Sequence, residues 1–312
     1  MLINSDTCNV LIFFGIWYKL WTGGAMTELK GKPVADAIYV DITVQISTWN
    51  QKQWSAPHLA VLLVGSDPAS EVYVSHKQKA CEKLNFKSTV IRLSENSTEI
   101  EIAMALQKLN NDKSVDAILM QLPLPSHLDG KKMTELIHPA KDADGLTQAS
   151  LGALVAGKQI VASCTPAGII EILKFYKINL VNKKVAVLGR SLIVGLPLFH
   201  LLVQENATVT LCHSKTDNLK TIIADMDVVF VAIGKPEFFK STDFKKGAVV
   251  IDIGIHRKPE GLCGDIAAGN SDHLAARTPV PGGVGPMTIA MLMKNTLTLA
   301  AKHRAASTQV NL

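Results

Sequence analysis

The chain has 312 residues, enough for two domains of ordinary size, and its 47% hydrophobic and 19% charged residues favour a globular protein. The net charge is +5, the lysines are spread along the chain and aromatic residues make up only 5%, which argues against a nucleic-acid-binding surface. The five cysteines show no C-x-x-C pair and no metal-ligand spacing. This pattern argues against a disulfide framework and a metal site, and it favours the cytoplasm.

Residues 1–25 are unlike the rest of the chain. The apolar run 10–17 is too short to cross a bilayer, and no positive charge precedes it, as a secretory signal requires. We interpret residues 1–25 as an extension of unknown role and Met26 as the natural start, and we expect no membrane partner. A membrane-associating segment is the alternative.

The first half of the chain alternates between expected helices and expected strands. The helices are expected at 34–49, 67–84 and 99–109, and the strands at 59–64, 89–93 and 117–122. The apolar run 59–64 ends at Gly65, which is typical of a buried parallel strand. Asp67 followed by Pro68 gives a helix cap with proline at the first helical position. This alternation predicts an α/β domain.

A second α/β set follows in the second half. Helices are expected at 165–176, 194–204 and 218–224, strands at 184–188, 207–212, 228–233 and 248–253, and a final helix at 286–304. The strand 184–188 ends at Gly189-Arg190-Ser191, directly before a helix. A strand, a tight glycine turn and a helix N-terminus can together hold a phosphate, although the G-x-S pattern is degenerate and a plain turn is the alternative.

The next strand distinguishes between the two nicotinamide cofactors. In NAD sites an acidic residue usually ends this strand and binds the ribose hydroxyl. Here Ser214 and Lys215 follow the strand instead, which favours the extra phosphate of NADP, and Arg190 can contact the same phosphate. A solvated loop is the alternative for Ser214 and Lys215. Ile255, at the end of strand 248–253, is a candidate for lining the nicotinamide pocket, or else a core residue.

A possible chemical site lies in the first half. Tyr73 and Lys77 are four residues apart on an expected helix and therefore share one face. On the local pattern alone, an exposed lysine-rich helix is the better explanation of this pair. Gln121 ends a buried strand, and the loop with Asp142 and Asp144 carries carboxylates. Ligands bind at such strand ends in open α/β folds.

Near the C-terminus, the run 281–290 carries three glycines and two prolines before a long apolar helix. Glycine allows the backbone to approach a ligand closely, and proline suits a helix start. The run is typical of a rigid loop that faces a ligand, although an ordinary Gly/Pro turn is the local alternative.

Six segments occur in an order that resembles the successive motifs of the bifunctional methylenetetrahydrofolate dehydrogenase/cyclohydrolase family. They are 65–77, 121–124, 141–145, 165–168, 189–191 and 281–289. The resemblance extends from Met26 to about Arg304. Two departures are mild: Ala143 stands where the family usually has valine, and residues 1–25 match nothing.

The resemblance implies an α/β architecture with a three-layer N-terminal catalytic domain at 26–163 and an NADP-binding Rossmann domain at 164–282. A C-terminal helix at 283–312 is expected to return to the first domain. The ligands implied are tetrahydrofolate derivatives and NADP, without a metal. A homodimer formed through the Rossmann domains is also implied.

The resemblance further implies a role for each site residue. Lys77 is the candidate general base or water-polarising group, Gln121 holds Lys77 or the water, Tyr73 stacks on the pterin, and Asp144 accepts hydrogen bonds from it. The implied folate contacts are Tyr73, Gln121, Leu122, Asp144, Pro281, Gly282, Gly283, Pro286 and Thr288. The implied NADP contacts are Gly189, Arg190, Ser191, Ser214 and Ile255.

Two other classes of function stay open on the residues alone. A different NADP-dependent two-domain dehydrogenase is one, since short-chain dehydrogenases also use Tyr-x-x-x-Lys, but there the nucleotide glycines precede the pair. Here Tyr73 comes long before Gly189. A non-catalytic NADP sensor is the other, and it needs neither Lys77 nor Asp144.

Overall fold

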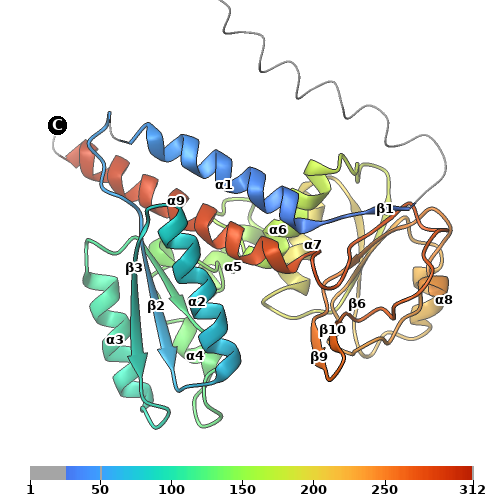
Figure 1. The fold of residues 1–312 in the computed structure, drawn as a ribbon, viewed down its shortest axis with the longest axis horizontal. Coiled ribbons are helices and arrows are strands. Elements are labelled where there is room, and N and C mark those ends of the chain that lie inside the picture. The colour runs from blue at the N-terminus through green and yellow to red at the C-terminus, as the bar shows by residue number, and fades with distance from the viewer. Residues whose placement is uncertain (1–25, 50, 311–312) are drawn as a thin grey trace, which may run out of the picture.

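A computed structural model describes residues 26–49 and 51–310. The extension expected at residues 1–25 therefore lies outside the described residues. Two α/β units lie side by side, and two long helices, α1 (Gly31–Ser47) and α9 (Gly285–Val310), run along them (Figure 1). The α/β class expected from the alternating pattern is confirmed.

The first unit is built on a three-stranded parallel sheet in the order β3-β2-β4. Its strands are β2 (His58–Val64), β3 (Lys87–Leu93) and β4 (Ala117–Met120). All seven residues of the central strand β2 are buried. This explains why β2 is continuously apolar rather than alternating, because helices cover both of its faces.

Helices cover this sheet on two sides and make three layers. They are α2 (Pro68–Lys83), α3 (Glu99–Asn111) and α4 (Gly130–Thr134). Leu62 of β2 belongs to the same apolar cluster as Ile102 of α3, whereas its neighbour Leu63 belongs to the cluster of Val74 in α2. Successive strand residues point to opposite faces, so one strand supplies both cores. The predicted three-layer arrangement is confirmed.

The helix starts of this unit follow from local capping. The Asp67 carboxylate accepts a hydrogen bond from the Ser70 backbone N–H at 2.8 Å, and Pro68 opens α2 as the sequence predicted. Thr98 and Glu101 form a capping box at the start of α3. Each cap satisfies N–H groups that the first helical turn leaves without a partner.

The second unit is a six-stranded parallel sheet in the order β1-β11-β8-β7-β5-β6. Its strands are β1 (Thr27–Glu28), β5 (Lys184–Leu188), β6 (Thr208–Cys212), β7 (Val228–Val231), β8 (Val249–Asp252) and β11 (Ala276–Arg277). Residues 27–28, which the sequence analysis assigned to the first domain, thus pair in the second sheet. A two-residue strand leaves no periodic signal in the sequence, so this pairing was not foreseen.

Helices α6 (Cys164–Phe175) and α7 (Gly195–Gln204) cover one face of the second sheet, and α8 (Leu219–Ile223) belongs to the core on the other. A hairpin of β9 (His256–Lys258) and β10 (Gly261–Cys263) projects from this unit. No pattern in the sequence predicted this hairpin, α4 or α5 (Gln148–Val155). These elements span only three to eight residues, too few for a reliable periodic pattern.

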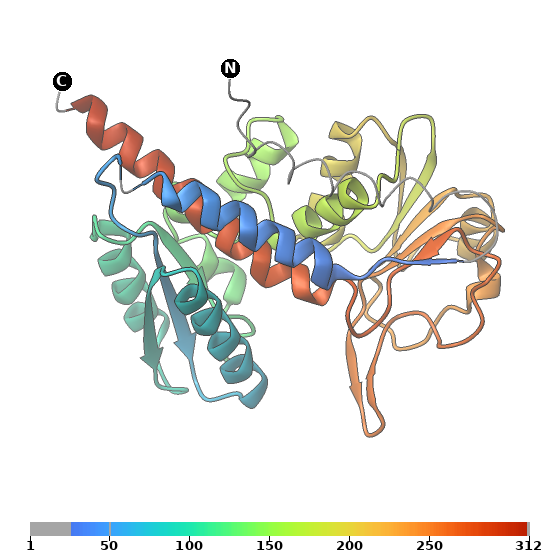
Figure 2. The same ribbon diagram turned by 45° about the horizontal axis from the view of Figure 1, so that its top comes forward.

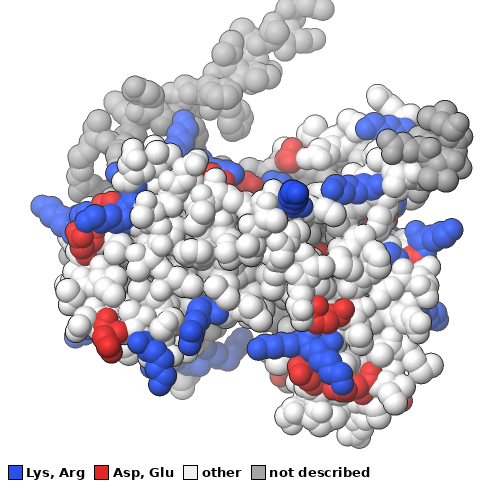
Figure 3. All heavy atoms as spheres, turned by 180° about the vertical axis from the view of Figure 1, so that it is seen from behind, with Lys and Arg blue, Asp and Glu red and all other residues white. Residues whose placement is uncertain are grey.

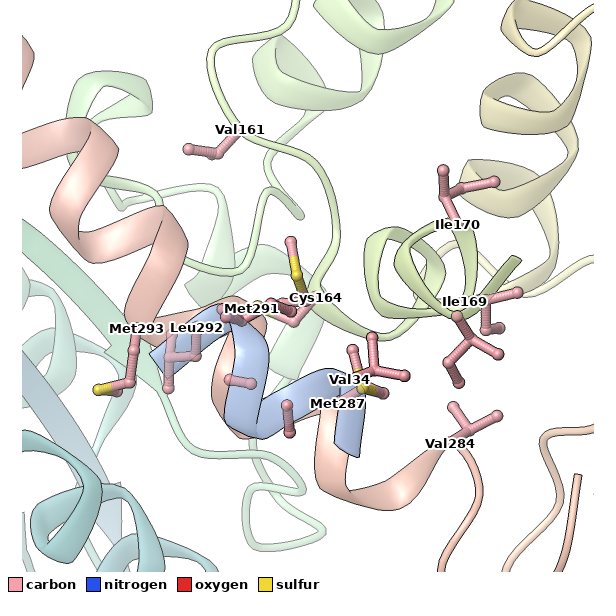
Figure 4. Packing of buried hydrophobic residues seen from close by; sticks show 14 of the residues in the cluster. Val34, Val161, Cys164, Ile169, Ile170, Val284, Met287, Met291, Leu292 and Met293 are labelled. Atoms are coloured by element: carbon pink, nitrogen blue, oxygen red, sulfur yellow. The ribbon is translucent and has the colours of Figure 1, made fainter. Parts of the chain in front are cut away.

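Helices α1 and α9 lie side by side in both ribbon views (Figures 1 and 2). The terminal helix α9 packs against α1, α2 and α6, so its predicted return to the first unit is confirmed. Its approach to α6 is close, since a Cβ on Gly168 would lie 2.6 Å from the Met287 Cβ. Figure 4 shows Met287 beside Val34 of α1. One apolar cluster therefore extends from Val74 in the first unit to Val187 in the second.

The described surface carries scattered charges. On the face in Figure 3, Lys and Arg side chains are spread over both units, several of them gather in the lower middle of the view, and some have an acidic side chain nearby. Among the described residues, no group of three or more His, Cys, Asp or Glu side chains is arranged to hold a metal ion. Within the same residues, no helix is both long and apolar enough to cross a membrane.

Candidate active site and nucleotide site

Lys77 and Gln121 meet where α2 passes the end of β4. The Lys77 ammonium donates a hydrogen bond to the Gln121 side-chain oxygen at 2.7 Å, and Lys77 is only 9% exposed. The Gln121 amide nitrogen donates to the Leu122 carbonyl at 2.7 Å, which directs the amide oxygen toward the lysine. The structure thus joins two residues that the sequence analysis named separately.

The charge state of Lys77 depends on its surroundings. Burial lowers the pKa of Lys77, and the nearby Asp144 and Cys164 oppose this change. Burial likewise raises the pKa of Asp144, with Lys77 acting in the opposite direction. A lysine with a lowered pKa gives up its proton more readily than an exposed one, as proton transfer near neutral pH requires.

The polar side chains of the loop at 141–145 make different contacts. The Lys141 ammonium donates to the backbone carbonyls of Leu109 and Asp112 at 3.0 and 2.7 Å. Asp142 accepts hydrogen bonds from Gly145 N–H, Thr147 N–H and the Ser150 hydroxyl. These two side chains hold the loop in place, which leaves Asp144 as the carboxylate beside Lys77.

Tyr73 lies one helical turn before Lys77 on α2 and is 47% exposed. Because residues four apart share a helix face, its ring lies on the outer part of the stripe that ends at the buried lysine. This placement agrees with an aromatic side chain that covers a flat ligand above Lys77. The stacking role itself stays a prediction.

The glycine-rich loop before α9 is fixed by close backbone contacts. Gly31 N–H donates to the Gly282 carbonyl at 2.9 Å, and a Cβ on Gly283 would lie 2.5 Å from the Pro279 carbonyl oxygen. The Val280–Pro281 peptide bond is cis, as is Leu122–Pro123. Pro286 lies in the first turn of α9.

Thr288 connects this loop to the lysine site. Its hydroxyl lies 2.9 Å from the hydroxyl of Thr165 in the first turn of α6. Thr165 directly follows Cys164, whose thiol donates to the carbonyl of Ala143, the residue before Asp144, at 3.7 Å. These contacts join the start of α9 to the peptide before Asp144, whose charge acts on Lys77, so that these segments can line one site.

The proposed phosphate turn is shaped by two glycines. Gly189 has a φ of +124°, and a Cβ there would lie 2.2 Å from the Ala232 carbonyl oxygen. A Cβ on Gly195 would lie 2.0 Å from the Gly189 carbonyl oxygen. The Ser191 hydroxyl accepts hydrogen bonds from Val194 and Gly195 N–H at the start of α7. The bare backbone and the helix N-terminus make a place where a phosphate can approach.

The polar residues that the sequence suggests for NADP lie along the same sheet edge. Strands β5 and β6 are paired up to Leu188 and Cys212, so the residues that follow them emerge side by side. Arg190, Ser214 and Lys215 are exposed there. Ile255 follows β8 and is 50% exposed, which favours a ligand-facing position over the core alternative.

Sequence reasoning missed two buried aspartates behind this site. Asp265 accepts hydrogen bonds from the backbone N–H groups of residues 233–235 at 2.7 to 3.1 Å and contacts the His256 ring at 2.7 Å. Asp252 accepts from the N–H groups of Gly254, Asp265 and Ile266, and burial raises its pKa to about 6. The pair fixes the loops around Ile255. The only hint of Asp265 in the sequence was the glycine at position 254. In the structure, a Cβ at Gly254 would lie 2.5 Å from the Asp265 carboxylate, so a larger residue would collide with it.

Both units match sequence models of known protein domains. Residues 29–144 match the description "Tetrahydrofolate dehydrogenase/cyclohydrolase, catalytic domain", and residues 163–304 match "Tetrahydrofolate dehydrogenase/cyclohydrolase, NAD(P)-binding domain". This chain belongs to the tetrahydrofolate dehydrogenase/cyclohydrolase family. Lys77, Gln121 and Asp144 fall in the part matched as catalytic, and the Gly189 turn falls in the NAD(P)-binding part.

Relatives named "Bifunctional protein FolD" support this assignment over most of the chain. The protein from Bdellovibrio bacteriovorus is 49% identical over 88% of this chain and 96% of its own length. The one from Agathobacter rectalis is 52% identical over 86% of this chain and 96% of its own length. The match therefore spans both units of the family's bifunctional members.

Solved structures of the family have the same fold. The bifunctional enzyme FolD from Campylobacter jejuni superposes with a TM-score of 0.86 at 40% identity, covering 89% of this chain and 99% of its own. FolD from Trypanosoma brucei, solved with NADP cofactor and an inhibitor, gives 0.84 at 33% identity over 90% and 99% of the two chains. The sequence-based expectation of this family and fold is confirmed.

Proposed function

We propose that this chain oxidises methylenetetrahydrofolate to methenyltetrahydrofolate with NADP, and then hydrolyses the product to formyltetrahydrofolate. The observation that carries the proposal is the buried Lys77–Gln121 hydrogen bond, with the charge of Asp144 acting on Lys77, in a chain whose two units match the catalytic and NAD(P)-binding domains of one family. A sensor without catalysis has no need of a buried lysine directed at a glutamine oxygen.

In the oxidation, the chain's main task is to hold two ligands in a reactive geometry. The turn at Gly189 and Gly195 fits a phosphate group because a Cβ at either glycine would collide with backbone. Bound NADP supplies the acceptor for the hydride that leaves the methylene carbon. Ile255 lines the ring site, while Arg190 and Ser214 contact the additional phosphate. Such positioning lowers the barrier without a protein acid or base.

The hydrolysis needs proton transfer, and here Lys77 acts. Water attacks the methenyl carbon, its proton passes to the Lys77 amine, and opening of the ring gives the formyl product after a proton returns to the leaving nitrogen. Gln121 orients Lys77 through the 2.7 Å hydrogen bond. Asp144 accepts hydrogen bonds from the pterin, and Tyr73 stacks on it. The backbone of the 281–288 loop completes the folate site.

One spectroscopic assay tests the proposal. Purified protein is incubated with methylenetetrahydrofolate and NADP, and the absorbances of NADPH and methenyltetrahydrofolate are followed. We expect NADPH to appear and methenyltetrahydrofolate to rise transiently and then decay. A protein that binds NADP and reduces none of it is a sensor, and NADPH formation only with other substrates indicates a different dehydrogenase.

Cofactor choice provides a specific prediction. We expect NADP to be preferred over NAD, and Arg190→Ala to raise KM for NADP about tenfold while KM for NAD changes less than about twofold, because the guanidinium contacts only the additional phosphate. Arg92→Ala, at an exposed arginine of β3, is the control and should change neither value. Equal increases for both cofactors would show that Arg190 does not meet that phosphate.

The assembly and location of the chain are also part of the proposal. We infer a homodimer formed through the second unit, where β6 ends the sheet with no strand beyond it among the described residues. Sedimentation velocity should give the mass of a dimer, and a monomer at micromolar concentration would contradict this. The free thiols of Cys81, Cys164, Cys212 and Cys263 support the predicted cytoplasmic location.

A further inference from the structure

Asn295 is a buried polar residue in the middle of α9. It is 4% exposed, on a helix whose neighbouring residues Met291, Leu292 and Met293 are apolar and belong to the core. Figure 4 shows Met291 of α9 next to Cys164, at the start of α6. Burying an amide among apolar side chains costs folding free energy unless the amide forms hydrogen bonds. The hydrogen-bond partners of Asn295 therefore indicate what the residue does.

The Asn295 amide nitrogen contacts two separate loops. It donates to the Ala143 carbonyl at 2.9 Å and to the Ala162 carbonyl at 2.9 Å, and it lies 3.5 Å from the Cys164 sulfur. Ala143 directly precedes Asp144, the proposed pterin ligand. A single side chain on the terminal helix therefore ties the Asp144 loop to the segment that leads into α6.

The two loops also rest on each other. The Ser163 hydroxyl lies 3.3 Å from the Gly145 carbonyl, and a Cβ on Gly145 would lie 3.1 Å from the Ser163 backbone nitrogen. The Cys164 thiol lies 3.7 Å from the Ala143 carbonyl. Apolar contacts fill space but do not fix direction, whereas two short hydrogen bonds from one planar amide do. The orientation of the peptide before Asp144 is thus set from α9.

We propose that Asn295 is a positioning residue of the folate site, which holds Asp144 at its place opposite Lys77 by fixing the peptide that precedes it. The inference rests on the proposed function in one respect, namely that Asp144 binds the pterin. Asn295 itself touches neither substrate nor cofactor.

The test compares Asn295→Leu and Asn295→Ala with Thr296→Ala in the full chain. Leucine has the same number and branching of side-chain heavy atoms as asparagine and lacks its donors, so it separates lost hydrogen bonds from a lost contact surface. Thr296 is the matched control: it is fully buried on the same helix, and its hydroxyl donates to the Leu292 carbonyl within α9. The melting temperature of each variant records its general stability.

We expect both Asn295 variants to raise KM for the folate substrate about tenfold in both reactions, since small displacements of positioning groups have effects of this size. KM for NADP should stay within about twofold, because its site lies on the other sheet. Thr296→Ala should lower the melting temperature and leave every KM within about twofold. A structural role alone would lower stability without this selective change.

Binding of tetrahydrofolate, measured by titration calorimetry, keeps the inference separate from the proposed function. If the wild type binds tetrahydrofolate but catalyses neither reaction, the proposed function fails. The Kd of the Asn295 variants for tetrahydrofolate still tests the positioning role, and we expect the same loss of affinity, about tenfold. Unchanged folate affinity in Asn295→Leu, an equal change in Thr296→Ala, or a parallel loss of NADP affinity would overturn the inference. A wild type that does not bind tetrahydrofolate would overturn both.

Discussion

Lys77→Met protein is expected to hydrolyse methenyltetrahydrofolate about a thousandfold more slowly than the wild type, since a positioned general base contributes effects of this order. Methionine has a similar length and an apolar end, so it suits a site that is only 9% exposed. Hydride transfer needs no protein base, and dehydrogenase activity should fall much less. Decay of methenyltetrahydrofolate absorbance measures the first reaction, and NADPH formation measures the second.

Lys79→Met is the matched control for this change. Lys79 lies on the same helix and is exposed, so both activities should stay near wild type. Circular dichroism of both variants should overlay that of the wild type. Hydrolysis at a near wild-type rate by Lys77→Met protein would show that another group accepts the proton.

Gly195→Ala should remove NADP-dependent oxidation almost completely while hydrolysis of methenyltetrahydrofolate continues. A Cβ at this position would lie 2.0 Å from the Gly189 carbonyl oxygen. The Gly189 oxygen belongs to the backbone and the added Cβ is fixed to the backbone of residue 195, so the contact is relieved only if the phosphate turn itself moves. We expect KM for NADP to rise at least about a hundredfold, since phosphate binding at this turn depends on close backbone approach.

Gly152→Ala provides the comparison for Gly195→Ala. Gly152 lies in the helix α5, where an added Cβ meets no atom within 4 Å, so this change should leave NADP kinetics unaltered. Retained hydrolysis in Gly195→Ala protein reports that the folate site is intact without a separate folding assay. An unchanged KM for NADP in this variant would place the cofactor elsewhere.

The larger elements of the fold could be predicted because local chemistry determines them. The apolar run of β2, the Asp67 cap and the glycine at the end of β5 each carry their signal within a few residues. The strand β1 could not be predicted in this way. Only two of its residues pair, and they pair with β11, whose residues lie more than two hundred positions later in the chain.

The residues of the candidate site likewise fall into those that local sequence predicts and those that only the three-dimensional structure reveals. Lys77 and Gln121 could be named because each lies at a recognisable place, on a capped helix and at the end of a buried strand. Their hydrogen bond and the separate tasks of Asp142 and Asp144 required the three-dimensional structure. Asn295 left no signal, since its partner Ala143 is 152 positions away. Contacts of this kind depend on the final packing of α9 and not on any local pattern.

Each unit contains an element from the far end of the described chain: β1 pairs in the second sheet, and α9 packs on the first unit. This arrangement has a consequence for synthesis on the ribosome. Strand β1 precedes every other described element, yet its neighbour β11 is translated more than two hundred residues later. The first sheet is translated well before the helix α9 that packs beside it, which follows every other described element. Neither unit can therefore complete its core before the last of these elements has been translated, although domains of many proteins fold one after another as they emerge. Until then both nascent units keep apolar surface exposed, so that native packing of the two is completed at nearly the same stage of synthesis.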